Sequence, residues 1–212
     1  MIAVELAEFK WGDPDIGVKL GQAAKAAAIT SSSKVELLRH EDFGAIEIQL
    51  HGELARVPNL KNRKQPVTLK DGRTLMLLNK DIMAKLHAMD ACFQAAESRT
   101  DGPWCMPAEL NLIVGVVAAT TKGAALDIDA YATSVLDWLE PATKGVVRGN
   151  EKLRGWGVGV IANDRLVKAV VTLQAGHVTA PCDFTRIIVG PMPQSEIGLN
   201  KFMKLCLDKE GL

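Results

Sequence analysis

The chain has 212 residues, and its 25 basic and 25 acidic side chains give a formal net charge of zero. Apolar residues make up 48% of the sequence, which indicates a globular protein with a substantial core and excludes disorder over most of the chain. No apolar run reaches the roughly 18–20 residues that a membrane span needs. No basic segment followed by an apolar stretch opens the chain, so we expect a cytoplasmic protein with no membrane partner.

The charged residues are unevenly distributed, although their total cancels. Residues 56–73 contain six basic residues and one acidic residue, and residues 144–168 contain six basic residues and two acidic ones. A neutral total argues mildly against a nucleic-acid partner, but local positive fields persist within it. The four cysteines, at positions 92, 105, 182 and 206, lack Cys-x-x-Cys spacing, which argues against a cysteine zinc site.

Three regions are expected along the chain. Residues 1–43 are an N-terminal extension, with helical composition over residues 15–28 and a short second helix that begins at Ser33 and ends at Leu38. Residues 44–190 form the main domain. Residues 191–212 form a C-terminal tail, for which a helix over residues 199–207 is expected.

The main domain shows the patterns of both strands and helices. Ala45 to Leu50 alternates apolar and polar residues, which predicts a half-buried strand. Asp71-Gly72 is typical of a two-residue hairpin turn, and the apolar run over residues 110–119 predicts a buried central strand. Helices are predicted over residues 79–96 and 128–139, and further strands over residues 67–70, 73–78, 156–162, 166–174 and 184–189. This order predicts an α+β fold, with a single mixed β-sheet and about two covering helices.

The chemistry of the chain centres on two aspartates that open the second predicted helix. Asp127 and Asp129 are two residues apart on extended backbone, so both carboxylates can face one point. Two adjacent carboxylates repel each other unless a cation lies between them, and hard oxygen ligands suit Mg²⁺, with Mn²⁺ as a substitute. The alternative interpretation is structural, with Asp127 as the N-cap and Asp129 in the first turn.

A third aspartate, Asp164, lies between two predicted strands. It is expected either to join Asp127 and Asp129 at the metal or to serve as a turn residue beside Asn163, since Asn and Asp both favour turns.

From Ala45 to Val189 the chain resembles the RusA family of crossover junction endodeoxyribonucleases, the Holliday junction resolvases. The resemblance begins with a strand and the loop Pro58-Asn-Leu-Lys-Asn-Arg63. It continues through Asp127-Ile-Asp129, a further aspartate at Asp137, and Asn163-Asp164-Arg-Leu-Val-Lys168. It differs from the family where Ala130 replaces an asparagine, Thr133 a lysine and Asn163 an aspartate.

The resemblance implies a RusA-like fold and a homodimer that cuts branched DNA. It implies that Asp127, Asp129 and Asp164 bind Mg²⁺ and that Asp137 supports them on the helix. A carboxylate-held Mg²⁺ activates water and neutralises developing charge on a phosphodiester. A two-fold dimer would present two equal sites to a four-way junction.

DNA contacts are expected from the two basic stretches. The loop Lys61-Asn62-Arg63-Lys64 would position backbone phosphates without reading sequence, unless it is a solvated surface loop. The lysine missing at Thr133 would be replaced from the insertion after Pro141. The candidates there are Lys144, Arg148 and Lys152.

Two other functions remain open from the sequence. The first is a catalytically weakened or inactive RusA-like protein that binds branched DNA as a structural factor, which Ala130 and Thr133 favour. The second is a metalloenzyme that acts on a small molecule. Junction binding without cutting would indicate the first, and a lack of DNA binding at low salt would indicate the second.

Overall fold

The computed structural model of the protein describes residues 33–60, 64–68, 71–72, 74–78, 80–119, 128–142, 144–147, 150–175 and 183–207. The helix expected over residues 15–28 lies outside them. Among these described residues, no helix combines the length and apolar character needed to cross a membrane.

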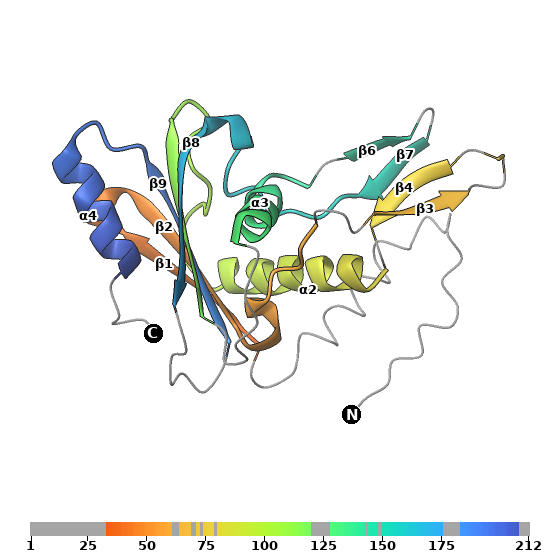
Figure 1. Ribbon diagram of the computed structural model, residues 1–212, viewed down its shortest axis with the longest axis horizontal. Helices are drawn as coiled ribbons and strands as arrows, with labels where there is room; N and C mark the ends of the chain where they lie inside the picture. The colour runs from red at the N-terminus through yellow and green to blue at the C-terminus, as the bar shows by residue number, and fades with distance from the viewer. Residues whose placement is uncertain are drawn as a thin grey trace.

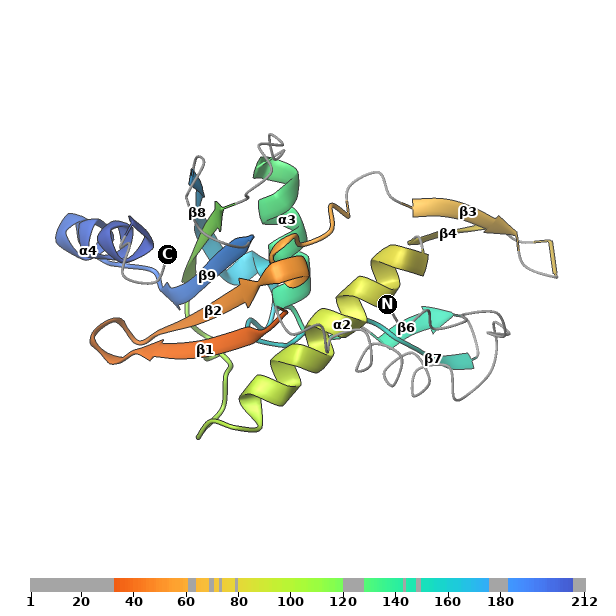
Figure 2. The ribbon, with the colours of Figure 1, turned by 90° about the horizontal axis from the view of Figure 1, so that it is seen from below.

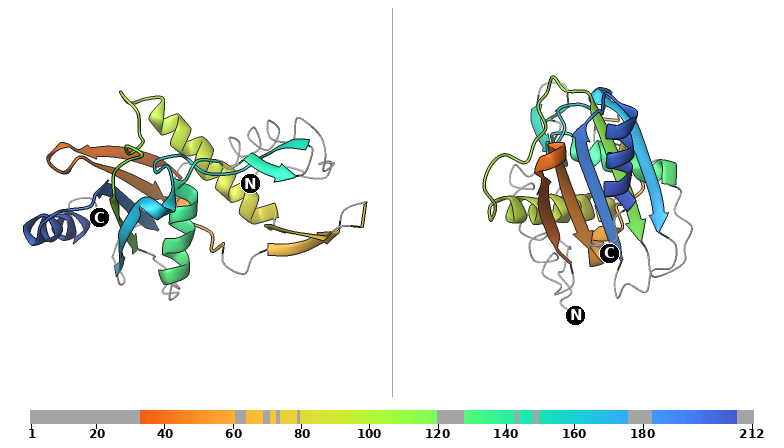
Figure 3. Two further views of the ribbon diagram at one scale, coloured as in Figure 1. Left: turned by 90° about the horizontal axis from the view of Figure 1, so that it is seen from above. Right: turned by 90° about the vertical axis from the view of Figure 1, so that its left-hand side faces the viewer.

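A five-stranded mixed sheet forms the centre of the molecule. Its strands are β1 (Val35–His40), β2 (Ala45–His51), β5 (Leu112–Ala119), β8 (Val167–Ala175) and β9 (Phe184–Pro191). Their order is β1-β2-β9-β5-β8, and all neighbours are antiparallel except the parallel pair β5 and β8. The right-hand view of Figure 3 shows the sheet from the side that carries the C-terminal helix. The α+β class and the mixed sheet predicted from the sequence are therefore confirmed.

Within the described residues, three α-helices cover the sheet, where about two were expected. Helices α2 (Lys80–Glu97) and α3 (Ile128–Leu139) lie on one face, and α4 (Glu196–Leu207) lies on the other (Figure 1). Alternate residues of each strand point to opposite faces, so β5 contributes to two cores. Val114 packs in the core shared with Trp138 of α3, whereas Ile113 packs in the core shared with Phe202 of α4.

Two hairpins extend from the body of the molecule. The Asp71-Gly72 turn lies between β3 (Lys64–Thr68) and β4 (Thr74–Leu78), as predicted, and Gly72 has a φ of 82° that favours glycine. The insertion after Pro141 forms a second hairpin from β6 (Lys144–Val147) and β7 (Asn150–Arg154). Figures 1 and 3 place both hairpins beyond the N-terminal end of α2, away from the sheet.

The segment from Ser33 to Leu38 is not a helix, which corrects the prediction. Val35 and Leu37 are buried and pair with Leu50 and Ile48 of β2. The alternation of these residues suits a strand, and burial against β2 outweighs local helix propensity. The sheet thus begins within the region that the sequence assigned to an extension.

The apolar segment over residues 156–162 is a loop in which only Val160 and Ile161 are fully buried, not the strand that was predicted. Its amides pair with carbonyls at the end of α3: Val158 N donates to Trp138 O at 3.0 Å, and Ile161 N donates to Leu139 O at 3.1 Å. The last carbonyls of a helix have no partner within the helix. The loop supplies those partners, and this explains its partial burial without a strand ladder.

Strand β2 is buried on both faces, although a half-buried strand was predicted. Its polar Glu47 accepts hydrogen bonds from Arg186 Nε at 2.8 Å and Gln49 Nε2 at 2.6 Å, and His40 Nε2 lies 2.8 Å from its other oxygen. Burial raises the pKa of Glu47, but these bonds outweigh that effect and the net pKa is lowered. A polar side chain is therefore accommodated under α4 because its hydrogen bonds are satisfied.

We expect Arg186→Met to lower the free energy of unfolding by about 3–5 kcal/mol, because it leaves the Glu47 carboxylate buried without its guanidinium partner. Urea unfolding at neutral pH measures this. Since the folded pKa of Glu47 is lowered from 4.5, the wild type should lose the pair's contribution as the pH falls through that folded value. The double variant Glu47→Gln/Arg186→Met should recover part of the loss. Equal stability of the single variant and the wild type would contradict the expectation.

Candidate functional site

Three strands end together at one edge of the sheet. Strands β2, β5 and β8 run in the same direction, and their last residues form one row through β9. His51 pairs with Phe184, Phe184 with Ala119, and Ala119 with Ala175. We call this end of the sheet, where β2, β5 and β8 have their carboxyl ends, the carboxyl edge. In open α/β sheets, ligands bind outside the carboxyl ends of the strands, so the segments that leave this edge are the first place to look for a site.

The 3₁₀ turn η2 (Gly52–Ala55) continues from β2 at the carboxyl edge and contacts the start of β9. Gly52 N donates to Asp183 O at 3.0 Å. Arg56, just after η2, forms an ion pair with the Asp183 carboxylate; its side chain is 43% exposed and that of Asp183 is 12% exposed. A pair as exposed as this contributes little stability, about 0–1 kcal/mol. The ion pair matters more because it engages the Arg56 guanidinium with Asp183.

Tyr131, in the first turn of α3, fastens that helix to the segment after η2. Its hydroxyl donates to Ala55 O at 2.6 Å, lies 2.7 Å from Thr185 Oγ1, and accepts from Val57 N at 3.4 Å. Burial raises the pKa of Tyr131 to about 12, so the phenol stays neutral and keeps its proton for Ala55. The hydroxyl therefore acts as a structural link.

Ser134 makes a second link, one turn further along α3. Leu60 N donates to Ser134 Oγ at 3.0 Å, and Ser134 Oγ donates to Ala130 O at 2.8 Å. Residues 55–60 are thus held against the first two turns of α3 (Figure 2). Leu60 directly precedes Lys61 in the sequence, so the last described residue before the basic loop is held beside α3.

The three predicted metal ligands are not brought together within one chain. Asp129 is exposed in the first turn of α3, whereas Asp164 N donates to Glu140 Oε1 at 2.6 Å just beyond the other end of that helix. The 12 residues of α3 span about 18 Å. Two ligands of one Mg²⁺ each lie about 2 Å from the ion, so Asp129 and Asp164 of the same chain cannot share one. Asp127 lies outside the described residues.

The other predicted catalytic residue, Asp137, is half-buried on α3, eight residues or about 12 Å along the helix from Asp129. It is therefore too far from Asp129 to share an ion with it within one chain. Over the described residues as a whole, no group of three or more His, Cys, Asp or Glu side chains is arranged to hold a metal ion.

Asp164 occupies a turn, as one of the two sequence interpretations expected. It begins the 3₁₀ turn η3 (Asp164–Leu166), and Asn163 Oδ1 accepts from Arg165 N at 2.8 Å to cap it. Its side chain is exposed. The carboxylate is therefore open to solvent at the edge of the sheet opposite the carboxyl edge.

Thr133 stands where the resemblance leads one to expect a lysine. Its Oγ1 donates to Asp129 O at 2.9 Å, within the same helix. This bond to the backbone four residues back is common for threonine in helices. Thr133 therefore provides no positive charge near Asp129.

A lysine does lie near the carboxyl edge, on α2. Lys85 is half-buried, and burial lowers its pKa; Glu53 of η2 opposes that shift, and Arg56 and Asp183 also act on it electrostatically. Among the described residues, the charged groups at this edge are four carboxylates (Glu36, Glu53, Asp129 and Asp183) and three cations (Lys34, Arg56 and Lys85), with His51 paired to Glu36. This local excess of acidic groups favours a bound cation.

Three of the predicted DNA-binding residues lie on the two hairpins. Lys64 begins β3, Lys144 begins β6, and Lys152 lies within β7. The others fall outside the described residues: Lys61, Asn62, Arg63 and Arg148. The prediction that these residues contact DNA stays a prediction.

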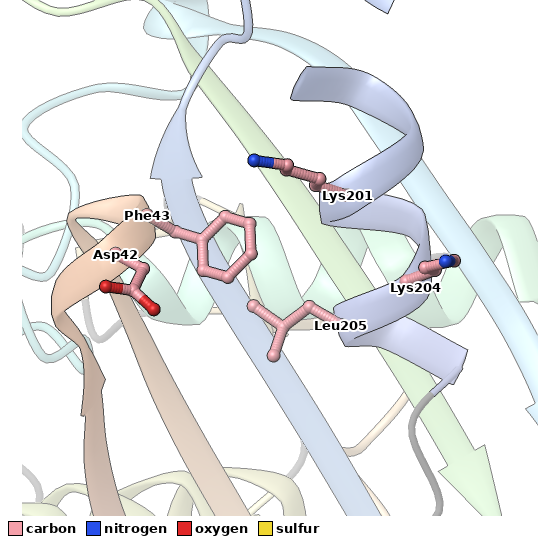
Figure 4. A pocket seen from close by; sticks show the side chains of 5 residues that line it. All are labelled: Asp42, Phe43, Lys201, Lys204 and Leu205. Atoms are coloured by element: carbon pink, nitrogen blue, oxygen red, sulfur yellow. The ribbon is translucent and has the colours of Figure 1, made fainter. Parts of the chain in front are cut away.

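An open hollow of about 620 Å³ lies elsewhere, between α4 and the turn η1 (Glu41–Phe43) that joins β1 to β2. Figure 4 shows Phe43 and Leu205 pointing toward one another, with Asp42, Lys201 and Lys204 around them. Since η1 precedes β2, the hollow lies at the opposite end of that strand from the carboxyl edge. It is therefore separate from the site described above.

Reasoning from the sequence missed several charged residues of the carboxyl edge. Glu53, Lys85 and Asp183 stand in no recognisable motif. Asp183 matters because it precedes a strand that pairs between β2 and β5, and only the strand order shows this. A signal existed for Arg56 alone, as the first member of a basic stretch.

No protein-family model, no curated protein and no solved structure matches this chain.

We expect Ser134→Ala to loosen residues 55–60, because it leaves the buried Leu60 amide without its acceptor. An unsatisfied buried donor costs about 1–3 kcal/mol. Hydrogen exchange at the Leu60 amide should accelerate by at least tenfold. The matched control is Thr133→Ala, which removes an exposed hydroxyl one residue away and should leave that exchange rate unchanged. Equal exchange rates in both variants would show that Ser134 does not hold the segment.

Proposed function

We propose that this protein is a metal-dependent endonuclease that hydrolyses phosphodiester bonds in branched DNA such as Holliday junctions. One observation carries the proposal: the hydrogen bonds of Tyr131 and Ser134 hold residues 55–60, which directly precede the basic loop in the sequence, beside the helix in whose first turn Asp129 lies. Leu60 and Asp129 are more than 60 residues apart in the sequence. Phosphate-binding and metal-binding groups must be neighbours in such an enzyme.

The donor set suits a hard, partly hydrated cation. Asp129 is exposed at the start of a helix, two residues after Asp127 in the sequence. Among the described residues, the carboxyl edge has more carboxylates than cations. Mg²⁺ prefers one or two carboxylates and keeps several waters, and Mn²⁺ accepts the same ligands. A bound Mg²⁺ would lower the pKa of a coordinated water and offset charge on the phosphate. Asp127 and Asp129 would hold it, and the loop Lys61-Asn62-Arg63-Lys64 would place the backbone.

Asp164 has a place in this proposal only across two copies of the chain. Within one chain α3 separates it from Asp129, so a site containing both needs Asp129 from one copy and Asp164 from another. A C₂ homodimer would form two such sites, and a four-way junction has the same two-fold symmetry. A ligand set that contains both Asp129 and Asp164 therefore requires the homodimer, so the two expectations stand or fall together.

We expect Asp129→Asn to reduce junction cutting by at least a hundredfold while binding persists, because the amide is a poorer metal ligand but leaves the DNA-contacting loop intact. Cutting is measured on synthetic junctions, forks and linear duplex with Mg²⁺, Mn²⁺ or EDTA. Asp42→Asn is the matched control, since Asp42 is exposed in η1 at the opposite end of β2. Normal cutting by the Asp129 variant would rule out this site.

A mixture of two inactive variants tests the shared site. If Asp129→Asn and Asp164→Asn are each inactive, heterodimers contain one site with both native aspartates and one site with neither. We expect the mixture, after unfolding and refolding together, to nick one strand of a junction without the paired second nick. Absence of nicking in the mixture, with each variant shown to be dimeric, would contradict a site shared between copies.

A second candidate function is the binding of branched DNA without cutting. The placement of Asp164 and the internal hydrogen bond of Thr133 favour it, because both leave Asp129 with fewer catalytic neighbours in the chain. Junction binding with no cleavage in either metal would support it over the nuclease. A lack of DNA binding at low salt would exclude both and leave a metalloenzyme for small molecules.

A further inference from the structure

Lys85 holds a positive charge in a half-buried position beside the candidate site. It lies on α2, which Figures 1 and 2 both show next to η2. The charged groups that act on it are Glu53 of η2, Arg56 and Asp183. All three belong to segments that meet at the carboxyl edge, so Lys85 lies within electrostatic reach of that edge.

The ammonium group of Lys85 is half-buried among charged side chains. Within the part of the chain that the structure describes, no carboxylate forms an ion pair or hydrogen bond with it. The neighbouring Arg56 differs, because its guanidinium is engaged by Asp183. An ammonium has three donors and no acceptor, so removing it from water is costly unless an anion provides acceptors.

We propose that Lys85 contacts a phosphate of the DNA backbone bound at the carboxyl edge. This rests on the proposed function, which places a phosphodiester beside Asp129. Lys85 thereby supplies the positive charge that Thr133 does not. It would act from α2 and not from the hairpin insertion, whose Lys144 and Lys152 lie on strands beyond the end of α2.

A phosphate contact has a signature that a structural role lacks. Each phosphate that a cation neutralises releases condensed counterions, so it steepens the fall of log K with log salt by about 0.9. A lysine that only offsets Glu53 and Asp183 changes stability but not this slope. The salt dependence of DNA binding therefore separates the two roles.

The experiment measures binding of the full chain to a synthetic four-way junction by fluorescence anisotropy, in EDTA so that no cutting occurs, over a series of salt concentrations. Lys85→Gln and Lys85→Met should each weaken binding several-fold and make the slope shallower by about 0.9. Methionine keeps the apolar stem packed, so one neutral variant remains informative should the other fail to fold. Lys85→Arg should keep the slope, and Lys204→Gln on the exposed side of α4 should match the wild type.

Two results would overturn the proposal, and they differ. If the wild type binds the junction and the neutral Lys85 variants share its slope and affinity, Lys85 makes no phosphate contact, while the proposed function stands. If the wild type does not bind DNA at any salt concentration, the proposed function fails, and the inference fails with it.

Discussion

Helix α3 is fixed at both ends by buried hydrogen bonds, and the separation of Asp129 from Asp164 follows from this. At its start, Tyr131 and Ser134 hold the segment after η2. Near its end, Asp90 of α2 accepts from Trp138 Nε1 at 2.8 Å and from Gly157 N at 3.1 Å. A helix held in this way cannot slide along the sheet without leaving buried polar groups unpaired. Its length then sets the distance between the carboxyl edge and the turn that carries Asp164.

The same condition of satisfied polar groups operates on the other face of the sheet. Glu47 and Arg186 are buried under α4 with complete hydrogen bonding, and within the described residues no buried side-chain nitrogen or oxygen lacks a partner. A shift of one residue between β2 and β9 would move Glu47 into the apolar core on the α3 side. The buried ion pair therefore penalises the wrong register, and in doing so it keeps η2 and Asp183 together at the carboxyl edge.

Local patterns predicted those elements whose signals are local. The helix over residues 128–139 was right because its apolar face, its acidic start and Pro141 agree, and the first hairpin was right because Asp71-Gly72 suits its turn. Residues 33–38 and 156–162 were wrong because their structure depends on distant partners. The site shows the same division. Asp129 was expected at a helix start and is found there, but convergence with Asp164 depended on strand order, which the sequence does not display.

The neutral total charge conceals a separation that suits the proposed function. Lys64, Lys144, Lys152 and Arg154 of the two basic stretches lie on the hairpins, whereas Glu53, Asp129 and Asp183 lie at the carboxyl edge. A polyanion is drawn first to the basic segments, while a divalent cation is drawn to the acidic edge. In the proposed enzyme, most of the affinity for DNA would therefore come from the hairpins and the chemistry from the edge. Thr133 supplies no charge beside Asp129, so a compensating cation would have to come from another element, as we propose for Lys85 of α2.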